Sequence, residues 1–158
     1  MNNQQKFETF LQITTALNQE LDSVPILYGS LGLSRSIEQD LATSDIDFLV
    51  EERVFAQSLT EIRRIMAQQG FVLADPDENE FHRGDFKVGI SHDGDMIEFS
   101  GINPAELKVE ERPAKYRVLT PEQYLATYRA SSKDGYRIEE RQKDDASKIE
   151  LLEALLND

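Results

Sequence analysis

Cysteine is absent from this chain of 158 residues, and no apolar stretch approaches the roughly 20 residues that a membrane-spanning helix needs. Without cysteines, nothing in the sequence points to an oxidising compartment. The N-terminal segment MNNQQKFETF also lacks the basic region and apolar run of a secretory signal. The sequence therefore predicts a cytoplasmic protein that does not span a membrane.

Basic residues are scarce as well. Seventeen lysines and arginines stand against thirty aspartates and glutamates, which gives a net charge of −13. The summed field of such a chain repels a nucleic-acid backbone. We therefore expect no long nucleic-acid partner, and an acidic surface fits a cationic small molecule or a basic protein better.

The length and composition predict one globular domain over residues 1–158. Hydrophobic residues make up 39% of the chain, an ordinary share for a globular protein. No internal repeat, low-complexity tract or linker interrupts it. We expect an α+β fold in which a mixed sheet is flanked by helices, with a core at about residues 22–119 and C-terminal helices at about 120–156.

Apolar periodicity and turn residues predict the individual elements. Helices are expected at residues 3–21, 31–41, about 54–69, 121–132 and 138–156. Strands are expected at residues 26–28, 45–50, 71–74, 86–91, 96–102 and 116–119. A hairpin turn at residues 92–95 is expected to join the strands FKVGIS and MIEFSGI, because His-Asp-Gly-Asp carries turn chemistry.

Two aspartates, Asp45 and Asp47, interrupt an otherwise apolar strand, SDIDFLV. Alternate residues of a strand share a face, so both carboxylates point to one side of the sheet. They repel each other unless a cation or hydrogen-bond donors compensate. Mg²⁺ suits this arrangement because it binds through one or two carboxylates together with substrate phosphates. A solvated strand end is the alternative.

A glycine and a serine, Gly29 and Ser30, follow the preceding strand ILY and come before a potential helix. Glycine lets the backbone approach a phosphate, and serine and the free N–H groups at a helix start complete an anion site. A simple tight turn is the alternative. The segment is neither a P-loop nor a dinucleotide fingerprint, because it lacks the lysine of the first and the glycine spacing of the second.

Together these motifs resemble the nucleotidyltransferase superfamily, the polymerase-β-like fold, of the minimal or antibiotic (lincosamide-like) type. The family signature is Gly-Ser, a helix, and then a strand with Asp-x-Asp, and it matches Gly29, Ser30, Asp45 and Asp47. The resemblance implies that Asp45 and Asp47 are catalytic and hold Mg²⁺ or Mn²⁺. It also implies that Gly29 and Ser30 bind a nucleoside triphosphate, for which ATP is expected.

Members of the superfamily usually carry a third carboxylate on a neighbouring strand. In the expected strand MIEFSGI, the alternation puts Glu98 on the face opposite Ile97 and Phe99, so Glu98 is predicted as the third catalytic and metal-binding acid. An exposed strand glutamate is the alternative. Asp85 and Asp95 are weaker candidates, because turn chemistry explains both.

The C-terminal helix carries polar residues on its apolar stripe. Gln142 and Asp145 extend the stripe of leucines, which predicts that they face a polar cleft, as a lid or an acceptor wall. On the same helix, Lys143 is predicted to contact the triphosphate, with Lys148 as a second possibility. A solvated helix face with charge pairs is the alternative for both lysines.

The sequence thus predicts a metal-dependent nucleotidyltransferase that moves a nucleoside monophosphate from a nucleoside triphosphate to a small-molecule or protein acceptor. A different class fits the same sequence. It is a non-catalytic interaction module, of antitoxin or regulatory type, that keeps the fold. Convergence of all three carboxylates would favour the enzyme.

Overall fold

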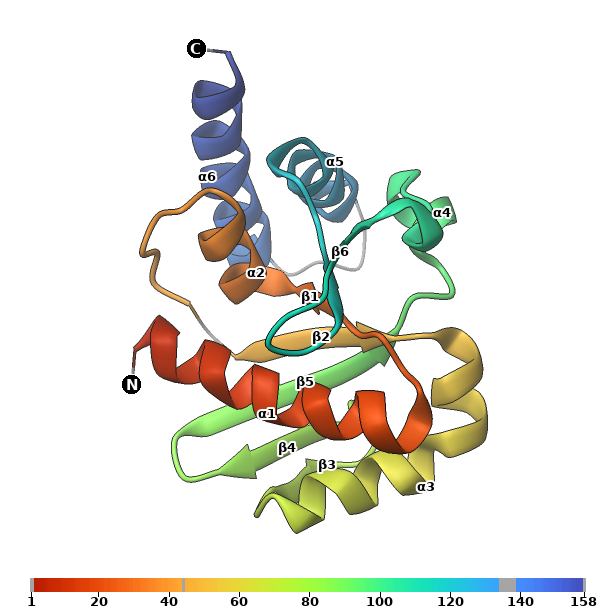
Figure 1. The fold of residues 1–158 in the computed structure, drawn as a ribbon. Coiled ribbons are helices and arrows are strands. Elements are labelled where there is room, and N and C mark those ends of the chain that lie inside the picture. The colour runs from red at the N-terminus through yellow and green to blue at the C-terminus, as the bar shows by residue number, and fades with distance from the viewer. Residues whose placement is uncertain (1, 44, 134–138, 158) are drawn as a thin grey trace.

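The computed structural model describes residues 2–43, 45–133 and 139–157, and within 139–144 the backbone alone (Figure 1). The α-helices are α1 (Asn3–Leu21), α2 (Gly29–Ser36), α3 (Glu52–Gln68), α4 (Met96–Ser100), α5 (Pro121–Ser132) and α6 (Glu139–Leu156), with one 3₁₀ turn, η1 (Pro104–Glu106). The strands are β1 (Ile26–Tyr28), β2 (Ile46–Val50), β3 (Val72–Asp75), β4 (Glu80–Arg83), β5 (Phe86–His92), β6 (Lys108–Glu110) and β7 (Tyr116–Val118).

The strands form one mixed, seven-stranded sheet in the order β3-β4-β5-β2-β1-β7-β6. Strand β2 lies at its centre, parallel to β5 and antiparallel to β1, and β1 is parallel to β7. The outer pairs β3–β4, β4–β5 and β6–β7 are antiparallel. The expected α+β architecture with a mixed sheet is confirmed.

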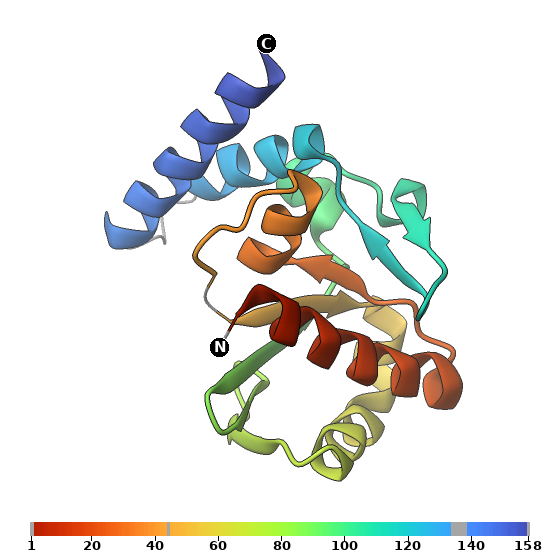
Figure 2. The same ribbon diagram turned by 60° about the vertical axis from the view of Figure 1, so that its left-hand side comes forward.

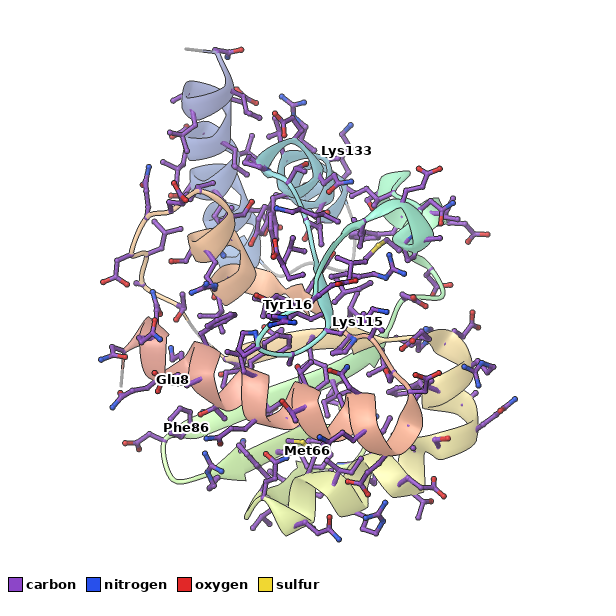
Figure 3. All side chains as sticks on the ribbon, viewed as in Figure 1. Glu8, Met66, Phe86, Lys115, Tyr116 and Lys133 are labelled. Carbon is purple, nitrogen blue, oxygen red and sulfur yellow. The ribbon has the colours of Figure 1, made fainter. Side chains whose placement is uncertain are left out.

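Helices α1 and α3 cover one face of the central strands (Figure 1). Alternation in β2 sends Ile46, Phe48 and Val50 to this face, where they meet the aromatic and aliphatic stripe of α1. Figure 3 shows Met66 of α3 and Tyr116 of β7 inside the fold, whereas Glu8 of α1 extends outward. Burial of these apolar side chains stabilises this half of the sheet.

A second hydrophobic cluster lies toward α5 and α6 (Figure 2). Tyr124 and Tyr128 of α5, Leu152 of α6 and Leu33 of α2 belong to it. Because alternation sends Asp47 of β2 away from the α1 and α3 side, its carboxylate lies on the side of the sheet that α5 and α6 partly cover. The sequence thereby separates a closed apolar face from a face that carries polar groups.

Several elements agree with the sequence to within a few residues. Helix α5 begins where Thr120 caps it, because the Thr120 hydroxyl accepts a hydrogen bond from the N–H of Gln123 (3.2 Å). The Gln123 side chain in turn accepts from the N–H of Thr120 (2.8 Å). After α3 ends, Gly70 adopts a φ of +85°, the left-handed conformation expected after a helix end.

Two predictions about elements are wrong, and two strands were not predicted at all. The segment MIEFSGI forms the short helix α4 instead of a strand, so the hairpin at residues 92–95 does not exist. The helix closes when the N–H of Gly101 donates to the carbonyl of Ile97 (2.8 Å), with Gly101 at a φ of +78°. Strands β4 and β6 were not expected, because each is short and at least half of its residues are charged.

None of the helices among the described residues is both long enough and apolar enough to cross a lipid bilayer.

Candidate active site

The candidate site begins where β1 passes directly into α2. Gly29 is the first residue of α2, and its φ of +66° lies in the left-handed region that glycine adopts at little cost. Ser30 follows it and is buried. The first N–H groups of an α-helix have no partner within the helix, and the helix dipole places partial positive charge there.

Strand pairing arranges four residues in a row across the sheet. Asp47 of β2 lies opposite Tyr28 of β1 on one side and Gly89 of β5 on the other, and Gly89 lies opposite Glu80 of β4. Directly opposed residues point to the same face of a sheet. The row therefore carries a phenol, a carboxylate, a bare backbone position and a second carboxylate.

The carboxylate of Asp47 lies in a space that two glycines leave open. A Cβ atom at Gly29 would be 2.8 Å from Asp47 Oδ2, and a Cβ atom at Gly89 would be 2.8 Å from Asp47 Oδ1. Both distances are shorter than real Cβ contacts, so any larger residue at either position would displace the carboxylate. The two glycines thus form a cradle, a space free of side chains that the Asp47 carboxylate occupies.

An open cavity of about 600 Å³ lies over this cradle. Gly29, Ser30, Asp47 and Gly89 line it from the sheet and the start of α2. The volume falls within the range of about 300–1,000 Å³ that small-molecule sites occupy. The cavity is therefore large enough for a nucleotide.

Helices α5 and α6 form the opposite wall of the cavity. Asp145 of α6 is 4% exposed and accepts a hydrogen bond from the Ser131 hydroxyl of α5 (Oγ–Oδ2, 2.8 Å). Lys148, one turn further along α6, places its ammonium 5.1 Å from the centre of the Tyr128 ring. All four side chains line the cavity.

Two buried phenols of α5 have perturbed acidity. Burial raises the pKa of Tyr128 far above its ordinary value, and the nearby Tyr28, Asp145 and Asp47 raise it further. Burial also raises the pKa of Tyr124, whose hydroxyl donates to the carbonyl of Leu27 in β1 (3.3 Å). Tyr128 thus lies within electrostatic range of the carboxylates on both walls.

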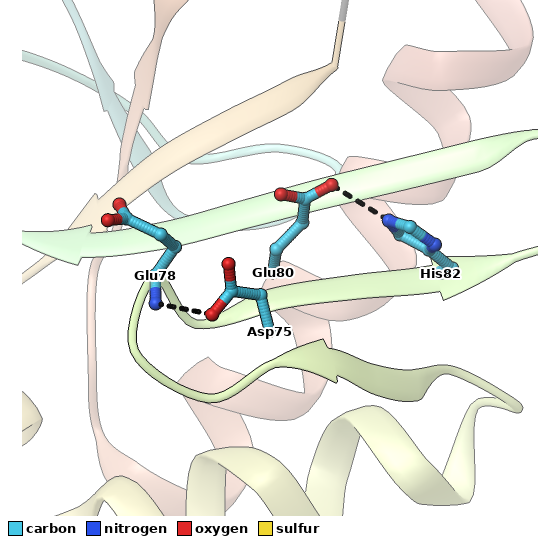
Figure 4. A network of polar contacts seen from close by, with 4 residues as sticks. All are labelled: Asp75, Glu78, Glu80 and His82. Carbon is cyan, nitrogen blue, oxygen red and sulfur yellow. Dashed lines mark hydrogen bonds and ion pairs between the residues drawn. The ribbon is translucent and has the colours of Figure 1, made fainter.

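An acidic loop joins β3 to β4 (Figure 4). The N–H of Glu78 donates to Asp75 Oδ1 (3.3 Å), which shapes the turn, and the exposed Glu78 lines the cavity. At the start of β4, Glu80 forms an ion pair with His82 (Oε1–Nε2, 2.8 Å). Among the described residues, Glu78 thus joins Asp47 and Asp145 as an acidic residue that lines the cavity.

The structure brings several of the predicted site residues together. Gly29, Ser30 and Asp47 line one cavity, as the resemblance implied. Asp45 directly precedes β2 and is half-buried, but it is not among the residues that line the cavity. The side chains of Gln142 and Lys143 lie outside the described residues. The cavity-lining position of Asp145 agrees with the predicted polar cleft.

The predicted role of Glu98 rested on a strand that does not form. Glu98 lies on helix α4, its side chain is exposed, and it is not among the residues that line the cavity. Its helical neighbour Phe99 does line the cavity. Within the described residues, no cluster of three or more aspartate, glutamate, histidine or cysteine side chains could hold a metal ion.

Sequence reasoning missed Gly89 and the tyrosines. Gly89 could have been found from the sequence, because a glycine inside an apolar strand often marks a place where a ligand or another part of the chain lies close to the strand. Tyr28 and Tyr128 gave none, since a tyrosine beside an apolar run fits a packed core equally well. Only the fold places both phenols beside Asp47.

Two solved structures share this architecture. The chain is similar to the antibiotic-resistance factor ANT(2'')-Ia, with a TM-score of 0.57, 15% identity, and coverage of 99% of this chain and 93% of that one. It is also similar to an antigenic nucleotidyltransferase-like protein from Paracoccidioides brasiliensis, with a TM-score of 0.60, 13% identity, and coverage of 96% and 77%. The fold is therefore the nucleotidyltransferase fold.

Among curated sequences, the uncharacterized protein YnaI of Bacillus subtilis (strain 168) is 34% identical over 151 residues. The match spans 95% of this chain and 97% of YnaI. The chain belongs to the same family as YnaI. None of the known protein-family profiles matches it.

Proposed function

We propose that this protein is a metal-dependent nucleotidyltransferase. It moves a nucleoside monophosphate, expected to come from ATP, to a small-molecule or protein acceptor. The observation that carries this proposal is the cradle in which Gly29 and Gly89 hold the Asp47 carboxylate beside the first turn of α2. A fixed anion beside a phosphate-binding helix start is what a metal-bound triphosphate needs.

The residues present fit Mg²⁺ or Mn²⁺. The donors are carboxylate oxygens, which hard divalent ions prefer, and Asp47 points into a cavity with room for phosphate oxygens to complete the coordination. Asp47 and Asp45 would hold the ion. When bound, it would offset the negative charge on the phosphates during attack at the α-phosphorus.

The first turn of α2 binds and orients the triphosphate. Backbone N–H groups at Gly29 and Ser30 donate to phosphate oxygens, and the absence of a side chain on Gly29 allows the close approach. Lys148 reaches the same cavity from α6 and adds a positive charge in an otherwise acidic site. Lys148 is the second of the two lysines that the sequence predicts to contact the triphosphate, and the side chain of the first, Lys143, lies outside the described residues.

The acceptor binds against the α5 and α6 wall. Tyr128, Ser131 and Asp145 present a phenol, a hydroxyl and a buried carboxylate to the cavity across from Asp47. Groups on this wall hold the acceptor nucleophile in line with the α-phosphorus and exclude water around it. The overall acidity of the chain favours an acceptor with positive charge.

One observation favours a second function. The position of Glu98 leaves the described part of the site without the third carboxylate that the resemblance implied. A protein that had lost catalysis but kept the fold would act as a non-catalytic interaction module of antitoxin or regulatory type. The two functions differ in whether the acceptor is modified.

A labelled-nucleotide assay tests the proposal. The protein, MgCl₂ and ATP labelled at the α-phosphate are incubated with panels of cationic small molecules and with basic proteins. We expect transfer of the label to an acceptor with release of pyrophosphate, loss of transfer in Asp47→Asn, and normal transfer in Glu98→Gln. Nucleotide binding without transfer across the panels would favour the interaction module instead.

A further inference from the structure

The loop that joins α2 to β2 connects the two parts of the candidate site. Helix α2 begins with Gly29 and Ser30, and β2 follows Asp45 and carries Asp47. Between them, residues 39–43 have no regular secondary structure. A loop of this kind moves readily unless other contacts hold it. Asp45 lies between this loop and β2.

Asn3, in the first turn of α1, holds this loop at several points. Its amide nitrogen donates to Asp40 Oδ1 (2.7 Å) and to the carbonyl of Leu41 (2.8 Å). Its amide oxygen accepts from the Thr43 hydroxyl (2.6 Å). An amide is the side-chain group that donates two hydrogen bonds and accepts others at the same time, so Asn3 matches all three partners.

Two neighbouring residues reinforce these contacts. The ammonium of Lys6, one turn further along α1, donates to the carbonyl (3.0 Å) and the hydroxyl (2.8 Å) of Thr43. From α2, the buried Ser34 hydroxyl donates to the carbonyl of Gln39 and accepts from the N–H of Leu41 (3.3 Å). The loop is thus held from both helices up to two residues before Asp45.

We propose that the first turn of α1 is a clamp on residues 39–43 that sets the position of Asp45, and that Asn3 is its central positioning residue. The clamp consists of Asn3 and Lys6 of α1 together with Ser34 of α2. The role of Asp45 in this inference rests on the proposed function. The clamping of the loop itself does not.

The substitution Asn3→Asp tests the hydrogen bonds of the clamp without destabilising helix α1. Aspartate has the shape of asparagine but lacks both N–H donors, and it places a negative charge beside Asp40. At the first position of a helix, however, an acidic side chain interacts favourably with the helix dipole. The helix therefore keeps its stability while the two hydrogen bonds that Asn3 donates to Asp40 and Leu41 are lost.

Amide hydrogen exchange on the full chain tests the clamp directly. In Asn3→Asp we expect exchange within residues 39–47 to accelerate about tenfold or more, while the amides of α1 exchange as in the wild type. Gln12→Glu is the matched control. It makes the same change from amide to carboxylate at an exposed position of α1 and should leave the loop unchanged. Unchanged exchange of the loop in Asn3→Asp would overturn the clamp.

A second measurement tests the link to Asp45. Titration with MgCl₂ and a non-hydrolysable ATP analogue should show at least about tenfold weaker affinity in Asn3→Asp than in Gln12→Glu. Restoration of the amide at the same position with Asn3→Gln, whose longer side chain reaches the same loop, should recover part of the loss. Wild-type affinity in a variant with a released loop would overturn the positioning role. If the wild type itself binds no nucleotide, the proposed function fails, and the hydrogen exchange result still decides the clamp.

Discussion

At the scale of single residues, the orientation of Asp47 depends on what its neighbours lack. Gly29 follows β1 and Gly89 lies on β5, the two strands that flank β2, and a Cβ atom on either would be 2.8 Å from one of the two Asp47 oxygens. Replacement of either glycine by a residue with a Cβ atom is therefore expected to displace the Asp47 carboxylate. Gly84 offers a comparison, because its φ of +58° is similar to that of Gly29 while a Cβ atom there would meet nothing within 4 Å.

The pair Gly29→Ala and Gly84→Ala separates backbone strain from displacement of the carboxylate. Both place alanine at positive φ, which costs about 1–2 kcal/mol of stability. Only Gly29→Ala pushes on Asp47, so we expect it to abolish binding of the Mg²⁺ complex of a non-hydrolysable ATP analogue. Calorimetric titration of both variants measures this difference. Equal affinities in the two variants would mean that the cradle has no part in binding.

At the scale of elements, α5 links the fold to the candidate site. Its capping box fixes where it starts, and its tyrosines pack on α2 and β1 while Tyr128, Ser131 and Thr127 line the cavity. The contact with α2 requires Gly32, since a Cβ atom there would lie 2.0 Å from the Tyr124 hydroxyl. Helix α5 therefore couples the stability of the fold to the shape of the acceptor wall.

The buried tyrosines of α5 predict how stability changes at alkaline pH. The folded-state pKa of Tyr128 lies well above that of the unfolded chain, which is close to 10.0. Above this pH the unfolded chain loses a proton that the folded chain keeps, so the stability that is present below about pH 10 declines as the pH rises. Each such tyrosine contributes about 1.4 kcal/mol per pH unit to the decline.

Removal of the Tyr128 hydroxyl should reduce that slope. We expect the free energy of unfolding of Tyr128→Phe to fall less than that of the wild type between pH 10 and pH 11, by about 1 kcal/mol, because the unfolded tyrosine is only partly ionised over this range. Urea denaturation at several pH values gives both slopes. Identical slopes would show that Tyr128 ionises as easily in the folded protein as in the unfolded chain.

The elements that sequence predicts well are those with local signals. The capping box at Thr120 and Gln123 fixes the start of α5 through contacts within four residues. The motif of Gly29, Ser30 and Asp47 spans a strand, the short helix α2 and the next strand, which follow one another directly in the chain. These features do not depend on partners that are distant in the chain.

The rest depends on distant contacts. MIEFSGI alternates as a strand does, but it folds as α4, with Met96 buried while Ile97 and Phe99 remain 57% and 42% exposed. Glu98 was predicted to lie on one face of that strand, so its predicted placement fails together with the strand. By contrast, Asp145 was predicted to face a polar cleft because it continues a helical stripe. The residues it would face were not predictable, since Ser131 and Asp47 come from other elements.

At the scale of the whole molecule, the two faces of the sheet have different roles. The face under α1 and α3 is apolar and closed, whereas the other face carries the cavity between the sheet and the wall of α5 and α6. A chain with a net charge of −13 strongly favours the binding of cations at such an opening. Asp47 lines this cavity and Asp45 directly precedes the same strand, and the proposed function requires that the two hold a metal ion for a bound triphosphate.

The most direct test of that claim is the melting temperature with and without metal and nucleotide. Mg²⁺ or Mn²⁺ together with a non-hydrolysable ATP analogue should raise the melting temperature of the wild type, because a ligand that binds only the folded state stabilises it. Asp45→Asn and Asp47→Asn should each abolish this shift. Without metal they should melt at the wild-type temperature or slightly above it, since each removes like-charge repulsion. No shift in the wild type at millimolar metal and nucleotide, with both variants melting as it does, would contradict the transferase and leave the interaction module.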